Sequence, residues 1–322
     1  MTATDTRAAF PEDKAPDGSF RRLDSYFRDH VTADGSSGYR AEPGRYHLYV
    51  SYACPWAHRT IIYRHLKGLE DVISMTVVDP ERDERSWAIT GAPGTTSDPV
   101  NNFTFLSEGY VASDPDFGGR VTVPVLWDRE RKRIVNNESS EIIRMFDTEF
   151  DAFAAHPERH YLPEALRAEI DELNWFVYDN VNNGVYKTGF ATTQSAYERA
   201  FGNLFEALDE LDARLATRRY LVGGTITEAD LRLFPTLVRF DAVYVGHFKC
   251  NLRRIADYAN LSGYLRDIYQ HPGIAATVDM DQIKRHYYRT HPTLNPSRIV
   301  PLGPALDLAA PHGRERLSSA ES

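Results

Sequence analysis

Cysteine is scarce in this sequence, and its scarcity excludes one class of protein at once. Only two of the 322 residues are cysteines, Cys54 and Cys250. Two cysteines do not make the disulfide framework that stabilises many secreted domains. The first residues also lack the basic start and the apolar core of a signal peptide. We therefore expect a protein of the reducing cytoplasm.

Long apolar runs and an excess of basic residues are missing as well. No run of roughly 18 apolar residues occurs, so no membrane span is expected. The net charge is −9, whereas nucleic-acid binding usually requires a basic face. Glycine-rich nucleotide-binding motifs are absent, and the histidine pairs have no acidic or thiol neighbour at metal-ligand spacing. We therefore predict no membrane, nucleic-acid or metal partner.

The first half of the chain alternates between strand-like and helix-like patterns. Residues 1–45 are polar and rich in Gly, Pro and Asp, which predicts an extended arm. The pattern over residues 46–150 predicts a mixed domain of strands and helices. The expected strands cover 46–53, 72–78, 121–128 and 131–137, and the expected helices cover 55–68 and 138–146. Ser139 or Ser140 would cap the second of these helices. The long segment 79–118 has no sustained periodicity, and a loop of this length in a compact domain is usually functional.

The second half is almost wholly helical in pattern. Apolar residues recur at spacings of three and four, and Thr227 with Asp230 forms a capping-box pattern. We predict helices over 164–178, 194–217, from Thr227 onward and over 252–269. The sequence thus predicts an all-helical domain over residues 163–290 and a tail, rich in proline, glycine and charge, over residues 291–322.

Cys54 stands where the first predicted strand gives way to the first predicted helix. Pro55 suits the first helical position, because its missing N–H would have no helical partner there. Unpaired N–H groups at a helix start favour a thiolate, which is the nucleophilic form of cysteine. A lone cysteine is also commonly a small buried residue, so an inert role is the alternative. Ala57 replaces the second cysteine of a Cys-x-x-Cys motif, so a mixed disulfide at Cys54 would need an external thiol.

The order of these motifs resembles a known family. Cys54-Pro55 at the first helix, Val123-Pro124 before the third strand and Glu138-Ser139 at the next helix resemble a thioredoxin-like domain, and the helical half that follows is similar to that of glutathione transferases. Further blocks resemble the glutathionyl-hydroquinone reductases, the Xi class of these transferases. They cover residues 54–59, 183–190, 239–244, 247–252, 283–289 and 294–296.

The resemblance implies a fold, an activity and a partner. It implies a thioredoxin-like domain followed by an all-helical domain, a homodimer, and glutathione as co-substrate. The implied reaction converts glutathionyl-hydroquinones to hydroquinones and releases glutathione disulfide, with Cys54 as nucleophile and a mixed disulfide as intermediate. Tyr186 would protonate the leaving aromatic carbon, Tyr287 would hold the ring, and Tyr244 would help to keep the sulfur ionised.

The same resemblance implies a glutathione site. Its residues would be Trp87, Arg120, Val123, Pro124, Glu138 and Ser139. A cis proline at position 124 would turn the Val123 backbone toward the cysteinyl part of glutathione, like an added strand. Glu138 and Ser139 would hold the γ-glutamyl end, and Arg120 would pair with a carboxylate. By residue chemistry alone, plain capping is favoured for Glu138 and Ser139, strand residues and solvated charges remain the alternative for the others, and an ordinary helical core is favoured for each of the three tyrosines.

Other functions remain open at this point. A glutaredoxin-like thiol transferase could use the same sulfur to reduce protein or small-molecule mixed disulfides with glutathione. A non-catalytic module of the same fold would need neither Cys54 nor the tyrosines. A conjugating transferase activates glutathione with Ser or Tyr, and Cys54 argues against it. Cys250 has no evident partner in sequence and is predicted to be structural.

Overall fold

The computed structural model describes residues 13–317, which form two compact units. The first unit contains Leu23–His160 and Thr277–Thr290, and the second contains residues 13–22, Tyr161–Ala276 and residues 291–317. Each unit therefore combines segments that are separated in sequence, whereas the expected arm, domains and tail were continuous stretches of chain. Helix α10 (Met280–Thr290), whose residues were grouped with the helical domain by their pattern, belongs with the first unit.

The first unit is built on a four-stranded mixed sheet. Its strands are β1 (Tyr46–Val50), β2 (Ser74–Val77), β3 (Val125–Asp128) and β4 (Arg133–Asn136), in the order β2-β1-β3-β4. Strand β1 pairs parallel with β2, and the remaining pairs are antiparallel. The parallel pair requires a crossover, and α1 (Pro55–Leu66) supplies it, as the strand–helix–strand pattern predicted.

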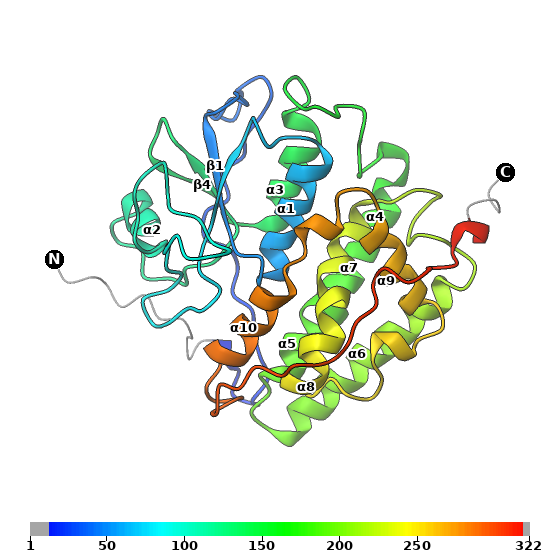
Figure 1. The fold of residues 1–322 in the computed structure, drawn as a ribbon. Helices are drawn as coiled ribbons and strands as arrows, with labels where there is room; N and C mark the ends of the chain where they lie inside the picture. Colours follow the sequence, from blue (N-terminus) through cyan, green and yellow to red (C-terminus); the bar gives the residue numbers. More distant parts are fainter. Residues whose placement is uncertain (1–12, 318–322) are drawn as a thin grey trace. The chain divides into compact units, whose positions relative to one another are not determined.

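Helices α1 and α3 (Ser139–Arg144) lie side by side in the first unit (Figure 1). Helix α1 ends at Leu66, just short of the predicted range 55–68, and Gly68 follows it with a φ of 64°, a left-handed conformation that glycine adopts readily. A π-helical turn, Met145–Glu149, continues α3. The cap of α3 differs from the prediction: Glu138 Oε1 accepts from the Ser140 N–H at 3.0 Å, so Glu138 caps the helix, not Ser139 or Ser140.

The strands are shorter than the apolar runs that predicted them. Strand β1 ends at Val50, because the Ser51 carbonyl accepts from the Cys54 N–H at 3.1 Å and so forms a turn. Strand β3 begins only after Pro124, which has no N–H for a ladder. The segment 79–118 is mostly irregular but contains one short helix, α2 (Ser107–Ser113), whose start is fixed by Glu108 Oε1 accepting two N–H groups.

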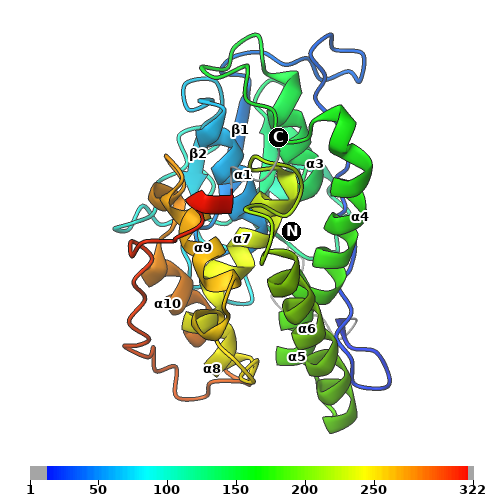
Figure 2. The ribbon, with the colours of Figure 1, turned by 90° about the vertical axis from the view of Figure 1, so that its right-hand side faces the viewer.

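The second unit is helical. It contains α4 (Arg167–Val177), α5 (Gly184–Gly189), α6 (Gln194–Arg214), α7 (Glu228–Arg239), α8 (Val245–His247) and α9 (Leu261–Gln270). The π-helical turns Tyr178–Asn182 and Phe240–Tyr244 and the 3-10 turns Glu164–Leu166 and Ile255–Asp257 extend or connect these helices. Helix α5 packs along α6 (Figure 2). The predicted capping box is confirmed, since Asp230 Oδ2 accepts from the Thr227 N–H at 2.8 Å.

The predicted helix over 252–269 is wrong in its first half. Helix α9 begins at Leu261, because Asp212 Oδ1 accepts from the N–H groups of Asn260 and Leu261, each at 2.8 Å. Upstream, the Asp241 carboxylate accepts the Ile255 N–H at 2.6 Å and holds that segment as a separate 3-10 turn. Both aspartates are distant in sequence, so the local apolar pattern carried no sign of them.

The tail is fixed to the second unit by polar contacts. The Arg314 guanidinium donates to backbone carbonyls that follow α6, among them Leu215 O at 3.0 Å, and Gln270 at the end of α9 donates to Ala310 O at 2.7 Å. These bonds hold the tail along the helices of its own unit (Figure 1).

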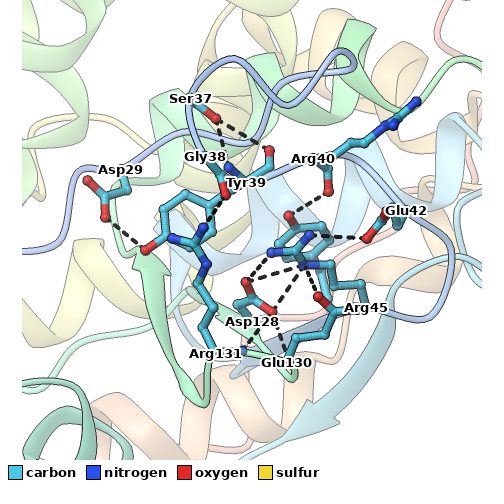
Figure 3. Close-up of polar contacts among 11 residues, drawn as sticks. Asp29, Ser37, Gly38, Tyr39, Arg40, Glu42, Arg45, Asp128, Glu130 and Arg131 are labelled. Carbon is cyan, nitrogen blue, oxygen red and sulfur yellow. Dashed lines mark hydrogen bonds and ion pairs between the residues drawn. The ribbon is translucent and has the colours of Figure 1, made fainter.

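A polar network ties residues 29–45 to the β3–β4 hairpin (Figure 3). Arg45 Nη2 lies 2.7 Å from Oδ2 of Asp128, a carboxylate with no solvent exposure at the end of β3. The Arg131 guanidinium stacks on the Tyr39 ring at 4.4 Å, and the Tyr39 hydroxyl donates to Asp29 at 3.1 Å. Residues 29–45 of the expected arm are therefore bound to the sheet unit by specific polar bonds, whereas residues 13–22 belong to the second unit and residues 1–12 lie outside the described residues.

Strand β1 also carries a buried titratable group. His47 has no solvent exposure, and its ring nitrogens lie 2.7 Å from Ser74 Oγ and 2.8 Å from Thr76 Oγ1 on β2. Burial lowers the pKa of His47 to about 4, because the charged ring is poorly solvated inside the protein.

We expect His47 to weaken the fold on acidification. The unfolded chain, in which the pKa of histidine is about 6.5, takes up the proton first as the pH falls. The contribution of neutral His47 to the free energy of unfolding is therefore complete above about pH 6.5 and is lost as the pH falls toward 4. The loss amounts to about 2 kcal/mol at pH 5. Urea unfolding at pH 7.5 and pH 5 measures this loss, which should be smaller in His47→Gln. An equal loss in the two proteins would contradict it.

Candidate active site

Cys54 occupies the position before the first residue of α1. Its backbone is extended, with φ −81° and ψ 121°, and Pro55 follows at the first helical position. The Cys54 carbonyl accepts the first helical bond, from the His58 N–H at 2.9 Å. The side chain lies at the positive end of the helix dipole, which favours a thiolate. The strand–Cys-Pro–helix arrangement predicted from the sequence is present.

The Cys54 thiol contacts the segment that precedes β3. Its sulfur lies 3.4 Å from the Val123 carbonyl oxygen, and the Val123–Pro124 peptide bond is cis, as the resemblance implied. The pairing of Tyr49 with Val125 explains the contact. In an antiparallel pair the end of one strand lies beside the start of the other, so the turn after β1 meets the residues before β3.

A buried tyrosine that the sequence analysis missed fixes this segment. The Tyr110 hydroxyl, on α2, donates to Thr122 O at 2.9 Å and accepts from the Thr122 N–H at 3.1 Å. It also accepts from the Asn137 side-chain amide at 3.1 Å. Thr122 and Asn137 directly precede Val123 and Glu138. One hydroxyl in the loop therefore positions both backbone segments of the candidate site.

Glu138 and Ser139 begin α3 and lie close to α1. Burial opposes the ionised form of Glu138, but hydrogen bonds from Ser140 and Ser25 and the charge of Arg59 hold its pKa below the usual value. The Ser25 hydroxyl, from the N-terminal half of the unit, donates to Glu138 Oε2 at 2.9 Å. Glu138 is thus a carboxylate at a helix start, able to accept a further hydrogen bond from an ammonium group.

Arg59 is a buried cation that the sequence analysis did not single out. Its guanidinium lies 4.6 Å from the Trp56 ring centroid, and Nη1 lies 3.5 Å from Ser139 Oγ. Arg59 is on α1 and Ser139 on α3, so this contact joins the two helices whose first turns carry Cys54 and Glu138. Its position within an ordinary helical pattern gave no signal of this role.

Trp87 lies in the irregular segment and is buried. Its ring stacks on His286 of α10, with centroids 5.2 Å apart and an angle of 17°, and the Arg82 guanidinium lies 5.4 Å from the ring centroid. His286 Nδ1 is held 2.6 Å from Pro80 O. The indole N–H of Trp87 has no hydrogen-bond acceptor among the described residues. A buried donor of this kind is costly unless a ligand satisfies it.

The remaining predicted residues divide between the two units. Arg120 is half-buried upstream of Val123, and Tyr287, on α10, is buried and lies edge-on to His286 at 5.2 Å; both belong to the first unit. Tyr186 on α5 and Tyr244 belong to the second unit. The structure brings these last two together, with ring centroids 6.2 Å apart.

The two tyrosines are part of a larger aromatic cluster in the second unit. The Phe248 ring lies 5.4 Å from both Tyr186 and Tyr244 and is nearly parallel to Tyr244, at 10°. Phe20, from the N-terminal segment, stacks on Tyr186 at 6.3 Å. Phe20 and Phe248 were not predicted as members of this cluster, because the loop and the arm that carry them have no periodic pattern.

Within residues 13–317, no group of three or more His, Cys, Asp or Glu side chains is placed to hold a metal ion. None of the helices in this range is long and apolar enough to cross a membrane.

Comparison with known families places both halves of the chain. Residues 53–149 match the model of the glutathione S-transferase N-terminal domain, and residues 194–267 match that of the glutathione S-transferase C-terminal domain. These matches confirm the predicted fold class, a small mixed-sheet domain followed by a helical domain.

Individual relatives cover nearly the whole chain. The glutathionyl-hydroquinone reductase YqjG of Escherichia coli is 55% identical over 309 residues, 94% of each chain, and the glutathionyl-hydroquinone reductase PcpF of Sphingobium chlorophenolicum is 51% identical over 302 residues, 94% of this chain and 95% of the relative. The glutathione-bound structure of YqjG superposes with a TM-score of 0.87 over 90% of this chain and 96% of that one. The structure of a Xi-class transferase from Natrialba magadii superposes with a TM-score of 0.89 at 53% sequence identity, over 93% of this chain and 95% of that one.

The two thiols should differ sharply in reactivity. Burial raises the pKa of the Cys250 thiol, which has no solvent exposure, whereas Cys54 is 9% exposed at a helix start. We expect iodoacetamide at pH 7.5 to alkylate Cys54 at least about tenfold faster than Cys250, because the thiolate is the reacting form. Mass spectrometry of tryptic peptides over time measures both rates. Comparable labelling of Cys250 in the folded protein would refute the assignment; labelling in urea is the control.

Proposed function

Because this chain belongs to the glutathionyl-hydroquinone reductases, the Xi class of the glutathione transferase superfamily, we propose that it reduces glutathionyl-hydroquinones to hydroquinones and that glutathione is the reductant. The observation that carries the proposal is Cys54 at the start of α1, in contact with the backbone before the cis proline. A sulfur in this place suits attack on the sulfur of a thioether or a disulfide.

The proposed reaction has two balanced steps. In the first, the Cys54 thiolate attacks the glutathionyl sulfur, a sulfur–sulfur bond forms, and the bond between sulfur and the aromatic carbon breaks. The electron pair stays with the carbon, which takes a proton and becomes the hydroquinone C–H. In the second step a glutathione thiolate attacks the mixed disulfide, restores the Cys54 thiolate and leaves as glutathione disulfide. Ala57 fits this route, since no neighbouring thiol competes.

We assign the glutathione contacts as the resemblance implied. The Val123 backbone would pair with the cysteinyl part, and Glu138 with Ser139 would hold the γ-glutamyl end. The lowered pKa of Glu138 supports this part, because an ionised carboxylate pairs best with an ammonium group. The unsatisfied indole N–H supports Trp87 as a donor to the ligand. Arg120 would pair with a carboxylate, and here only its residue type is in favour.

The tyrosines are assigned to the hydroquinone. Tyr186 would give the proton to the leaving carbon, Tyr244 would help to keep the sulfur ionised, and Tyr287 would hold the ring. The mutual contact of Tyr186 and Tyr244 in an aromatic cluster supports a site for a flat ring. A homodimer and a cytoplasmic location stay predictions from the resemblance and the composition.

The first test is turnover of glutathionyl-menadiol with glutathione, followed as release of menadiol and of glutathione disulfide. We expect the Cys54→Ala enzyme to lose turnover by at least about a thousandfold, because covalent catalysis has no substitute for the missing sulfur. Turnover that survives would mean that Cys54 is not the nucleophile. If the unchanged enzyme is inactive here but reduces glutathione mixed disulfides, the glutaredoxin-like alternative is favoured.

Trp87→Phe should weaken glutathione binding about tenfold with little change in stability, because it removes one donor to a charged ligand and keeps the stack on His286. Calorimetric titration of the Cys54→Ala protein, with and without the Trp87 change, gives the two dissociation constants. Trp127→Phe is the matched control, since Trp127 is a second buried indole whose N–H has no acceptor among the described residues and it lies on β3. If the Trp87 and Trp127 variants bind glutathione with equal affinity, the assignment of Trp87 to the glutathione site is wrong.

A further inference from the structure

The N-terminal segment, residues 13–22, packs within the helical unit although the residues after it belong to the sheet unit. Its backbone is bound to the start of α6. The Thr192 N–H donates to Gly18 O at 2.9 Å, and the Thr193 hydroxyl donates to Asp17 O at 2.8 Å. Gly18 has a φ of 84°, and a Cβ there would lie 2.6 Å from Thr193 Cγ2, so only glycine permits this approach. The segment therefore has one defined position on its unit.

This anchored segment places Arg22 beside α5, the helix that contains Tyr186. The Arg22 Nε donates to Asn183 Oδ1 at 2.6 Å, and Asn183 is the residue before α5. The centre of the guanidinium lies 4.9 Å from the centroid of the Tyr186 ring. Phe20, two residues earlier, stacks on the same ring. Tyr186 thus has a cation over one face and is held by two residues of a segment far away in sequence.

A guanidinium in this place affects the chemistry of a phenol in two ways. It restricts the ring, because cation–π contacts and the bond to Asn183 fix both partners. It also favours the form of a neighbouring phenol that has given up its proton, since opposite charge stabilises the phenolate. Both effects would assist a tyrosine that must present and release a proton.

We propose that Arg22 is a positioning residue for the reduction step and acts through Tyr186. This inference rests on the proposed function, in which Tyr186 gives its proton to the aromatic carbon as Cys54 takes the glutathionyl sulfur. Arg22 holds the ring in place and stabilises the phenolate that remains. The second step, attack of glutathione on the mixed disulfide at Cys54, has no use for this proton, so Arg22 serves one half-reaction only.

The two half-reactions can be measured separately. Rapid mixing of the reduced enzyme with glutathionyl-menadiol, without free glutathione, gives the rate of menadiol release. The isolated Cys54–glutathione mixed disulfide, mixed with glutathione, gives the rate of the second step. We expect Arg22→Gln to slow the first step about tenfold and to leave the second within about twofold, with partial rescue in Arg22→Lys, which keeps the charge.

The adjacent Arg21→Gln is the matched control, because Arg21 is exposed and has the same side chain; it should leave both steps unchanged. In a Tyr186→Phe background, Arg22→Gln should have no further effect on the first step, since residues that act through one another are not additive. Equal slowing of both steps, or a full effect in the Tyr186→Phe background, would overturn the proposal. Absence of menadiol release by the unchanged enzyme would instead overturn the proposed function itself.

Discussion

The Cys54 thiol lies 3.4 Å from the Val123 carbonyl, and the rest of the first unit is arranged so that this contact exists. Strand β1 leads to the cysteine and strand β3 follows the Val123 segment, so their antiparallel pairing brings the two together. Burial of the apolar residues of both strands holds that register, because a shift by one residue would turn their side chains to the opposite face. The sheet thus places the sulfur at the start of α1, where the helix dipole favours a thiolate.

Contacts with residues distant in sequence also explain why the long segment 79–118 has a defined conformation although it contains little regular secondary structure. It supplies single side chains that form hydrogen bonds with residues distant in sequence. The Tyr110 hydroxyl binds Thr122 and the Asn137 amide, and Asp98 accepts from Tyr49 of β1 at 3.0 Å. These groups are buried, so each unsatisfied partner would be costly and the loop has few alternative positions. Such a segment can hold Trp87 in place as firmly as a helix could.

Sequence patterns predicted the elements whose stability is local. The strand–helix–strand unit and the capping box of α7 follow from the apolar period and from backbone chemistry within a few residues. The patterns failed where a side chain distant in sequence determines the first residue or the cap of a helix. Asp212 delays the start of α9 to Leu261, and Glu138 takes the cap of α3 because Ser25 and Ser140 keep its carboxylate in place. The position of Cys54 at the start of α1 was predictable because the strand end, the cysteine and Pro55 lie within a few residues of one another.

The N-terminal segment is the clearest case of what a local pattern leaves out. Its apolar and basic residues show no period, because their partners lie on α5 and α6 and not on one continuous face. A segment held by a glycine contact and two backbone carbonyls keeps its order without a core of its own. Within the helical unit, the Tyr186 ring is therefore contacted by residues far from it in sequence in both directions, Arg22 before it and Phe248 after it. Side chains that act on a reactive group through such contacts are found by their distances and not by their spacing along the chain.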